Sequence, residues 1–169
     1  MVLTENEFQT LIANNPHVKI HTNKKEKQEK EKKTKKSPKY LNSKVYVYED
    51  GFVSDSKNAT NHGTVKEKYD SRKEYLRHME LSVMEEAGQI SKLDRQRRLE
   101  IQPKFTYKGK TIRAISYMAD FSYIRDGAQI IEDVKAFDEK RQKYLCTEAF
   151  LLKWKLLKAR YPDYSFELY

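Results

Sequence analysis

The sequence predicts an α/β (α+β) domain with a central mixed sheet, whose antiparallel three-strand core is flanked by helices. Apolar residues recur at helical spacing in residues 69–90 and 138–159. Between residues 99 and 137 they alternate with polar residues, as in strands. A last strand is expected at 165–169, so the order is helix, three strands, helix, strand.

The composition is that of a small, highly charged protein. Of 169 residues, 38% are hydrophobic and 35% are charged. No apolar run approaches the roughly 20 residues that span a bilayer, and the N-terminus lacks the pattern of a signal peptide. We therefore expect no membrane partner and a cytoplasmic location. The single cysteine, Cys146, excludes an internal disulfide and is more typical of a small core residue than of a nucleophile.

Three segments are expected along the chain. Residues 1–16 predict a short N-terminal helix, and residues 17–38 form a basic, lysine-rich arm with the composition of a disordered segment. Eleven lysines and three glutamates between Val18 and Lys44 give +8 of the net charge of +9. Such a segment suits a polyanion, above all nucleic acid, although a solubilising spacer has the same composition. Residues 39–169 are expected to form the folded domain.

The first predicted helix, residues 69–90, has Ser71 as its N-cap and Gly88 as its stop. Before it, Lys44–Val47 predicts a strand and Ser54–Lys68 a long loop. Its inward stripe is expected to comprise Leu76, Met79, Val83 and Ala87.

The predicted strands follow this helix. The first alternates from Leu99 to Tyr107, with Pro103 favouring an edge position, and a turn at Lys108–Lys110 leads to the second, Thr111–Tyr123. Arg125–Gly127 turns the chain into the third strand. The later elements are a long helix over Asp138–Ala159, a stop at Pro162 and a strand over Ser165–Tyr169.

Asp126-Gly127 is a strong signal for a two-residue type I′ hairpin. With these two residues as the turn, Asp120 faces Asp133 across the hairpin. Opposed Cβ atoms are about 4.5 to 5.5 Å apart, where like charges destabilise a sheet. Two carboxylates are therefore expected where folding alone would not favour them.

Strand alternation places Lys135 on the face of Asp133 and turns Glu132 and Val134 the other way. A hard divalent cation such as Mg²⁺ binds one or two carboxylates together with water and phosphate oxygens, which removes the repulsion. An adjacent lysine can orient a water or stabilise a phosphate under attack. These residue types favour metal-assisted hydrolysis of a phosphodiester.

Asp120 followed by Asp133-Val134-Lys135 resembles the motif of the PD-(D/E)XK nuclease superfamily, whose fold is restriction-endonuclease-like. Enzymes of this superfamily commonly add an acidic residue from a preceding helix, and Glu74 stands at that position. The chain departs from the motif at Ala119, where proline is usual, and at Ala136, where glycine is frequent. From Lys39 onward, the segments DSRKEY, LEIQPKF, IRAISYMADF and IIEDVK look like a family of phage and prophage proteins of unknown function, similar in layout to phage Holliday-junction-resolving endonucleases.

The resemblance implies a Mg²⁺-dependent endodeoxyribonuclease, with Mn²⁺ able to substitute. Catalysis would use Glu74, Asp120, Asp133 and Lys135, and the first three would bind the metal. It also implies branched DNA as substrate, a homodimer that makes two cuts and, for a phage-encoded protein, the cytoplasm of a bacterial host. The alternative is a catalytically silent DNA-binding or packaging accessory protein that keeps the nuclease fold.

Each proposed catalytic residue also has a structural explanation. Glu74 lies three residues after Ser71 and could only complete a capping box. Asp120 could pair with Lys110 or Arg113. Asp133 with Lys135 could form a surface salt bridge, and Glu132 is expected to be solvated or paired.

Substrate contacts are expected from one glutamine and a group of arginines. Gln102 could hold substrate or a water, or merely mark the end of an edge strand. The arginines from Arg95 to Arg98 are expected on a turn between helix and strand, a natural place for phosphate contacts. Tyrosines could line a nucleic-acid groove or fill the core. The proposed contacts are Gln102, Arg95, Arg97, Arg98 and Arg113.

Overall fold

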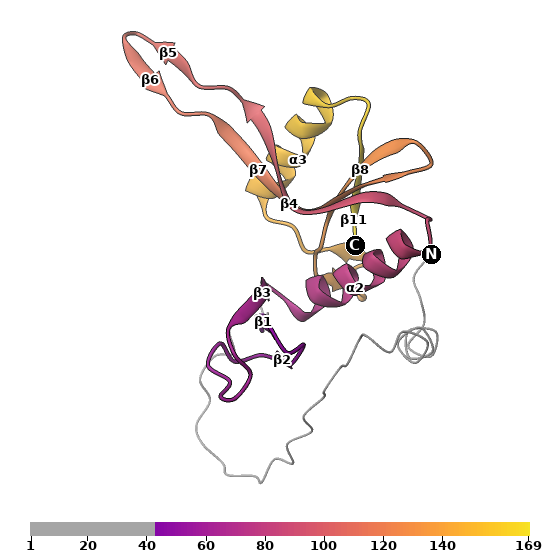
Figure 1. Cartoon of the computed structure of the whole chain (residues 1–169). Helices are drawn as coiled ribbons and strands as arrows, with labels where there is room; N and C mark the ends of the chain where they lie inside the picture. The colour runs from indigo at the N-terminus through magenta and orange to yellow at the C-terminus, as the bar shows by residue number, and fades with distance from the viewer. Residues whose placement is uncertain (1–42) are drawn as a thin grey trace. The chain divides into compact units, whose positions relative to one another are not determined.

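The structure, a computed structural model, describes residues 43–169 (Figure 1). The helix predicted over 1–16 and the arm over 17–38 lie outside the described residues. The chain divides into two compact units, one ending at Tyr75 and one from Leu76 to Tyr169, with the boundary inside helix α2. No helix in the described part of the chain is long and apolar enough to cross a membrane.

The first unit contains a three-stranded antiparallel sheet in the order β2-β1-β3. The strands are β1 (Val45–Tyr48), β2 (Val53–Ser54) and β3 (Val65–Tyr69). The predicted strand at 44–47 is confirmed within one residue. The predicted loop is wrong in part, since it includes most of β3. That strand reads V-K-E-K-Y, and too few apolar residues alternate there to give a strand signal.

Helix α2 (Arg72–Glu86) confirms the first predicted helix, with shorter ends. Gly88 follows it with φ +70°, the left-handed conformation that commonly ends helices. The predicted inward stripe is wrong in part: Leu76, Met79 and Val83 are half-buried and Ala87 is exposed. The buried residues on this part of the helix are Arg77 and Leu81. The buried face is rotated because Arg77 is paired inside the second unit, a contact that helical periodicity does not reveal.

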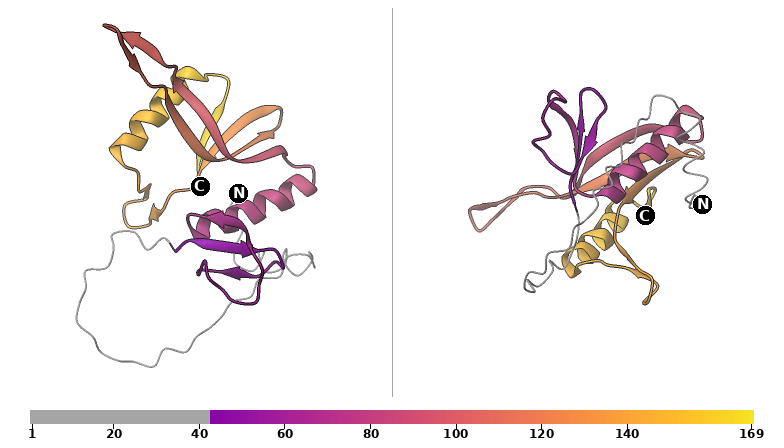
Figure 2. Two further views of the ribbon diagram at one scale, coloured as in Figure 1. Left: turned by 60° about the vertical axis from the view of Figure 1, so that its left-hand side comes forward. Right: turned by 90° about the horizontal axis from the view of Figure 1, so that it is seen from below.

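The second unit has a four-stranded mixed sheet in the order β11-β8-β7-β4, which confirms the predicted fold class (Figures 1 and 2). Strand β11 is parallel to β8, and the β8-β7 and β7-β4 pairs are antiparallel. The strands are β4 (Ser91–Gln102), β7 (Ile115–Arg125), β8 (Ala128–Asp133) and β11 (Ser165–Leu168).

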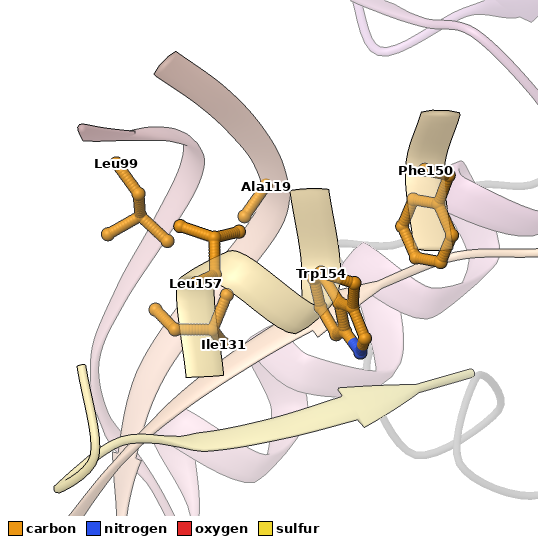
Figure 3. Close-up of a cluster of buried hydrophobic side chains, with 6 residues drawn as sticks. All are labelled: Leu99, Ala119, Ile131, Phe150, Trp154 and Leu157. Carbon is orange, nitrogen blue, oxygen red and sulfur yellow. The ribbon is translucent and has the colours of Figure 1, made fainter. Parts of the chain in front are cut away.

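Two hydrophobic clusters hold this sheet. Helix α3 (Glu148–Arg160) contributes Phe150, Trp154 and Leu157 to a cluster with Leu99, Ala119 and Ile131 (Figure 3). The C-terminal part of α2 contributes to the second cluster, which comprises Leu81, Ile90, Phe121, Tyr123 and Ile130.

The predicted hairpin between β7 and β8 is confirmed in its turn and in its register. Asp126 and Gly127 have φ +52° and +79°, as a type I′ turn requires. Arg125 pairs with Ala128 and Phe121 with Glu132, as the two-residue turn predicts.

Two further hairpins interrupt elements that were predicted to be continuous. Strands β5 (Phe105–Tyr107) and β6 (Lys110–Ile112) form a separate ribbon, so the predicted strand over 111–123 is two strands. Strands β9 (Phe137–Asp138) and β10 (Lys143–Tyr144) occupy the start of the long helix predicted from 138. Asp138 stabilises this second turn by accepting hydrogen bonds from the backbone N–H groups of Lys140 and Arg141.

Candidate active site

Asp133 is the last residue of β8 and is almost fully buried, at 2% exposure. Its Oδ1 accepts a hydrogen bond from the Tyr117 hydroxyl, and its Oδ2 forms an ion pair with the ammonium group of Lys135. That second oxygen accepts no hydrogen bond of ordinary geometry. Asp133 is therefore not a residue of a surface salt bridge. A buried carboxylate requires such compensation, and here one of its partners is a lysine with a flexible side chain.

Asp120 lies on β7, where the β7–β8 ladder stops. The last ladder pair is Phe121 with Glu132, and beyond it the Asp120 Oδ2 accepts a hydrogen bond of 2.7 Å from the backbone N–H of Val134. Burial, and then the negative charge of Asp120, raise the pKa of the Tyr117 hydroxyl above its usual range. Asp120 and Asp133 are thus both neighbours of one phenol, on the two strands where the predicted register put them.

Lys135 is held by its backbone and by its side chain. Its N–H donates to the Tyr169 carbonyl at 2.9 Å, while the Tyr169 N–H donates to the Asp133 carbonyl at 3.1 Å, which extends the β8–β11 pairing. The Lys135 Nζ lies 4.4 Å from the centre of the Phe150 ring. Phe150 is fixed in turn by the N-cap of α3, because its N–H donates to the Thr147 Oγ1 at 3.2 Å. The ammonium group therefore has a defined position between a carboxylate and an aromatic face.

Cys146 lies beside this group. Burial raises the pKa of its thiol, and the positive charge of Lys135 opposes that shift. The side chain is half-buried and packs against the cluster of Leu99 and Trp154. A half-buried thiol packed against this cluster agrees with the expected role as a core residue.

Glu132 lies on the face of β8 opposite to Asp133. It was expected to be solvated or paired, and it is paired. Its two carboxylate oxygens accept from Nε and Nη2 of Arg77 at 2.7 Å each, and Oε2 also accepts from the Tyr123 hydroxyl at 2.8 Å. Burial disfavours the charge on Arg77, but Glu132 and then Glu80 outweigh it, so the pKa of Arg77 lies above its usual range. Both oxygens of this carboxylate are thus held by fixed donors.

Glu74 lies in the first turn of α2 and in the first compact unit, separate from the unit of Asp120 and Asp133. Its N–H donates to the Ser71 Oγ at 3.0 Å, and its Oε2 accepts from the Asp70 N–H at 2.9 Å. The helix-capping role expected as the alternative for Glu74 is therefore present. Its role toward a metal stays a prediction.

The proposed substrate contacts lie along β4 and after β6. The prediction that the arginines from Arg95 to Arg98 lie on a turn is wrong, because they lie within β4. This strand is at the edge of the sheet, where a charged sequence protects an open edge and hides the usual strand alternation. Gln102 is the last residue of β4, opposite Ile115. Arg98 Nε donates to the Ser116 Oγ at 3.1 Å, and Arg113 lies between β6 and β7.

The donor set of Asp120 and Asp133 fits a hard divalent cation. Mg²⁺ binds proteins through one or two carboxylates and takes its other ligands from water and phosphate. The buried Asp133 Oδ2, with a cationic neighbour but no hydrogen bond, is the type of oxygen that such an ion would accept as a ligand. Within residues 43–169, no three Asp, Glu, His or Cys side chains are gathered so that they could hold a metal ion by themselves.

Two residues of this cluster, Tyr117 and Phe150, were missed by sequence reasoning. The predicted register places Asp133 opposite Asp120, whereas Tyr117 lies three residues before Asp120 on β7 and is not opposite Asp133. Its ring also contacts Phe150 and Trp154 of α3, at centroid distances of 6.0 and 5.8 Å. The available signal was an aromatic residue with a hydroxyl group just before the motif, which does not specify its partner.

Comparison with known proteins identifies a family. The model of a family described as "Protein of unknown function (DUF1064)" matches residues 38–168, so the chain belongs to this family. No curated protein and no solved structure matches the chain significantly.

Proposed function

We propose that this member of the DUF1064 family is a metal-dependent endodeoxyribonuclease that hydrolyses phosphodiester bonds. The observation that supports this most is the cluster of Asp120, Asp133 and Lys135 at the adjoining parts of β7 and β8. Asp133 is buried, and its ionic neighbour is an amine on a flexible side chain rather than a fixed guanidinium group. A buried carboxylate and a half-buried one beside a lysine suit metal-assisted hydrolysis of a phosphodiester.

Each residue has a distinct proposed role. Asp120 and Asp133 would hold Mg²⁺, or Mn²⁺ in its place, and Glu74 is proposed as a further ligand. When bound, the cation would polarise the scissile phosphate and lower the pKa of a coordinated water. Lys135 would exchange its ion pair with Asp133 for contact with the attacked phosphate or the water. The Tyr117 hydroxyl would keep Asp133 oriented.

The substrate is proposed to be DNA. The lysine-rich arm would supply affinity that depends on salt and not on sequence, with Arg95, Arg97, Arg98, Arg113 and Gln102 as further contacts. The resemblance to junction-resolving phage enzymes supports branched DNA, including Holliday junctions, and the two cuts of resolution require a homodimer. The cytoplasm of a bacterial host is the location that this role implies.

One observation favours the alternative, a silent DNA-binding or packaging accessory protein. Both oxygens of Asp133 already have partners, in Tyr117 and Lys135. If Lys135 never leaves Asp133, the carboxylate is only a structural element of the sheet.

Incubation of the purified full-length protein with supercoiled plasmid and with a four-way junction separates these functions. We expect cleavage with Mg²⁺ or Mn²⁺, loss of cleavage with EDTA and no cleavage by Asp133→Ala. Glu132→Gln is the matched control, because it changes the neighbouring buried carboxylate on the opposite face. Binding of DNA without cleavage under either cation would support the accessory protein and refute the nuclease.

A further inference from the structure

The β5–β6 hairpin, here called the finger (residues 104–113), extends beyond the four-stranded sheet as a continuation of β4 and β7 (Figures 1 and 2). Every residue of the finger is exposed. It belongs to neither hydrophobic cluster. Its side chains are therefore not explained by packing within the described chain.

The finger combines aromatic and cationic groups. Phe105 pairs with Ile112 and Tyr107 with Lys110, so these four side chains share one face of the ribbon. Phe105 is 44% exposed and Tyr107 is 59% exposed. The Lys108 Nζ lies 5.5 Å from the centre of the Tyr107 ring, over its face. Four positive charges and no acidic residue lie in this segment, at Lys104, Lys108, Lys110 and Arg113.

Two occupants have the chemistry to cover this face: a second copy of the chain, or a nucleic acid. Symmetric pairing of two fingers would bring four positive charges against four others with no acid between them, which opposes that contact. A polyanion removes this repulsion. Its bases also offer π-faces to the two exposed rings, and aromatic stacking with flanking cations is the usual means of binding unpaired nucleic acid.

The strands set an upper limit to the distance between the finger and the acidic cluster. At about 3.3 Å per residue, Ile112 is at most about 26 Å and Lys110 at most about 33 Å from Asp120 along the strands. One turn of B-DNA is roughly 34 Å. The finger would therefore contact DNA within about one turn of the cleaved bond.

We propose that the finger binds DNA at unstacked bases, with Phe105 and Tyr107 stacking on base faces and the lysines contacting phosphates. This inference rests on the proposed action on DNA and adds the part of the chain that would recognise unstacked bases. Base faces are hidden within a continuous duplex, so the finger selects branch points or single-stranded segments.

The test measures binding in EDTA, so that cleavage plays no part. The probe is a four-way junction with 2-aminopurine at its centre, compared with a fully paired duplex of equal length. Phe105→Ala/Tyr107→Ala should weaken junction binding by about 5- to 100-fold for each stacking ring and abolish the change in 2-aminopurine fluorescence. Duplex binding should change less than about twofold. The matched control is Phe137→Ala on the β9–β10 hairpin, an equally exposed aromatic residue at 43%, which should leave both affinities unchanged.

Three results would overturn the proposal: unchanged junction binding, equal losses on junction and duplex, or conversion of a dimer to a monomer in sedimentation analysis. The last would identify the finger as a contact between copies. Because the finger lies outside the core, circular dichroism and the urea midpoint of the variant should equal those of the wild type. If the wild type binds DNA through the finger but never cleaves it, the nuclease proposal fails and the finger proposal stands. If the wild type cleaves DNA and the finger variant still binds the junction, only the finger proposal fails.

Discussion

Glu132 and Asp133 are adjacent, almost fully buried carboxylates on the two faces of β8. Glu132 accepts two hydrogen bonds from Arg77 and one from Tyr123. Asp133 has one hydrogen bond from Tyr117 and the ammonium group of Lys135. The first is compensated by a planar guanidinium group in a two-point contact, the second by a point charge on a flexible side chain.

Under the proposed function, this difference separates a structural role for Glu132 from a functional one for Asp133. The Arg77–Glu132 pair is further fixed by Glu80 and by stacking of the guanidinium group 4.1 Å from the centre of the Tyr169 ring. Both oxygens of the Glu132 carboxylate therefore accept hydrogen bonds from fixed donors. Under the proposed function, Asp133 would exchange its lysine for a metal ion, because an ammonium group loses little geometric specificity on leaving.

The largest expected effect is on catalysis by Asp133→Asn. The amide keeps the shape of the side chain but removes the charge that would hold a divalent cation. A bound cation contributes several kcal/mol to the transition state, so we expect the cleavage rate to fall by about 10³-fold or more. Initial rates on the four-way junction with Mg²⁺ measure it. A loss of less than tenfold would place the reaction elsewhere.

Glu132→Ala should act on stability instead. The substitution removes the carboxylate that binds Arg77 at two points and leaves the buried guanidinium group with Glu80 alone, which should cost up to about 3 to 5 kcal/mol in the free energy of unfolding, measured by urea denaturation. The double variant Arg77→Met/Glu132→Ala should regain part of this loss, because the buried positive charge is removed but Glu80 loses its arginine partner. A single variant as stable as the wild type would show that the buried pair contributes nothing to the fold.

Lys135→Gln should reduce the cleavage rate by about 10²-fold while the protein still binds Mn²⁺. Removal of one preorganised group that stabilises developing charge typically has this effect. Single-turnover rates with saturating DNA separate this loss from weaker binding. Equal rates for the variant and the wild type would reduce the lysine to a partner for Asp133 in the free protein.

The smallest expected effect is a loss of stability at alkaline pH, caused by buried tyrosines on both faces of the sheet. Burial raises the pKa of Tyr117 and Tyr123, and burial with the charge of Glu80 raises the pKa of Tyr169 to about 12. An unfolded tyrosine ionises near pH 10, so the unfolded state loses these protons first. The contribution of these three tyrosines to the free energy of unfolding should therefore be constant below about pH 10 and fall as pH rises toward 12.

Urea denaturation at pH 8, 10 and 11 measures this slope. Tyr123→Phe should make it shallower, because one group with a raised pKa has been removed. A slope that does not respond to this substitution would assign the loss of stability to other groups.

The parts of this account that sequence predicts are local. Asp126-Gly127 specified the turn and hence the register that brings β7 and β8 together. The partner of Glu132 was not predictable, because Arg77 is 55 residues away. An arginine is also usually found on the exposed face of a helix, whereas Arg77 is buried. The charged sequence of β4 concealed a strand for a related reason: an edge strand needs few apolar residues.

The start of α3 shows a similar limit. A helical pattern was expected from Asp138, yet the helix begins at Glu148. Asp138 closes a turn with hydrogen bonds that compete with helix formation, and Thr147 caps the helix that begins after it. The contacts around Lys135 depend on this later start, since it places Phe150 beside the ammonium group.

The most direct test of the central claim is binding of Mn²⁺ measured by electron paramagnetic resonance, with and without a four-way junction. The wild type and Glu132→Gln should bind the ion with the same affinity. Asp120→Asn/Asp133→Asn should lose this binding while keeping its circular dichroism spectrum and its affinity for DNA. Equal Mn²⁺ binding by the double variant, or none by the wild type with DNA present, would contradict the assignment of these two carboxylates as a metal site.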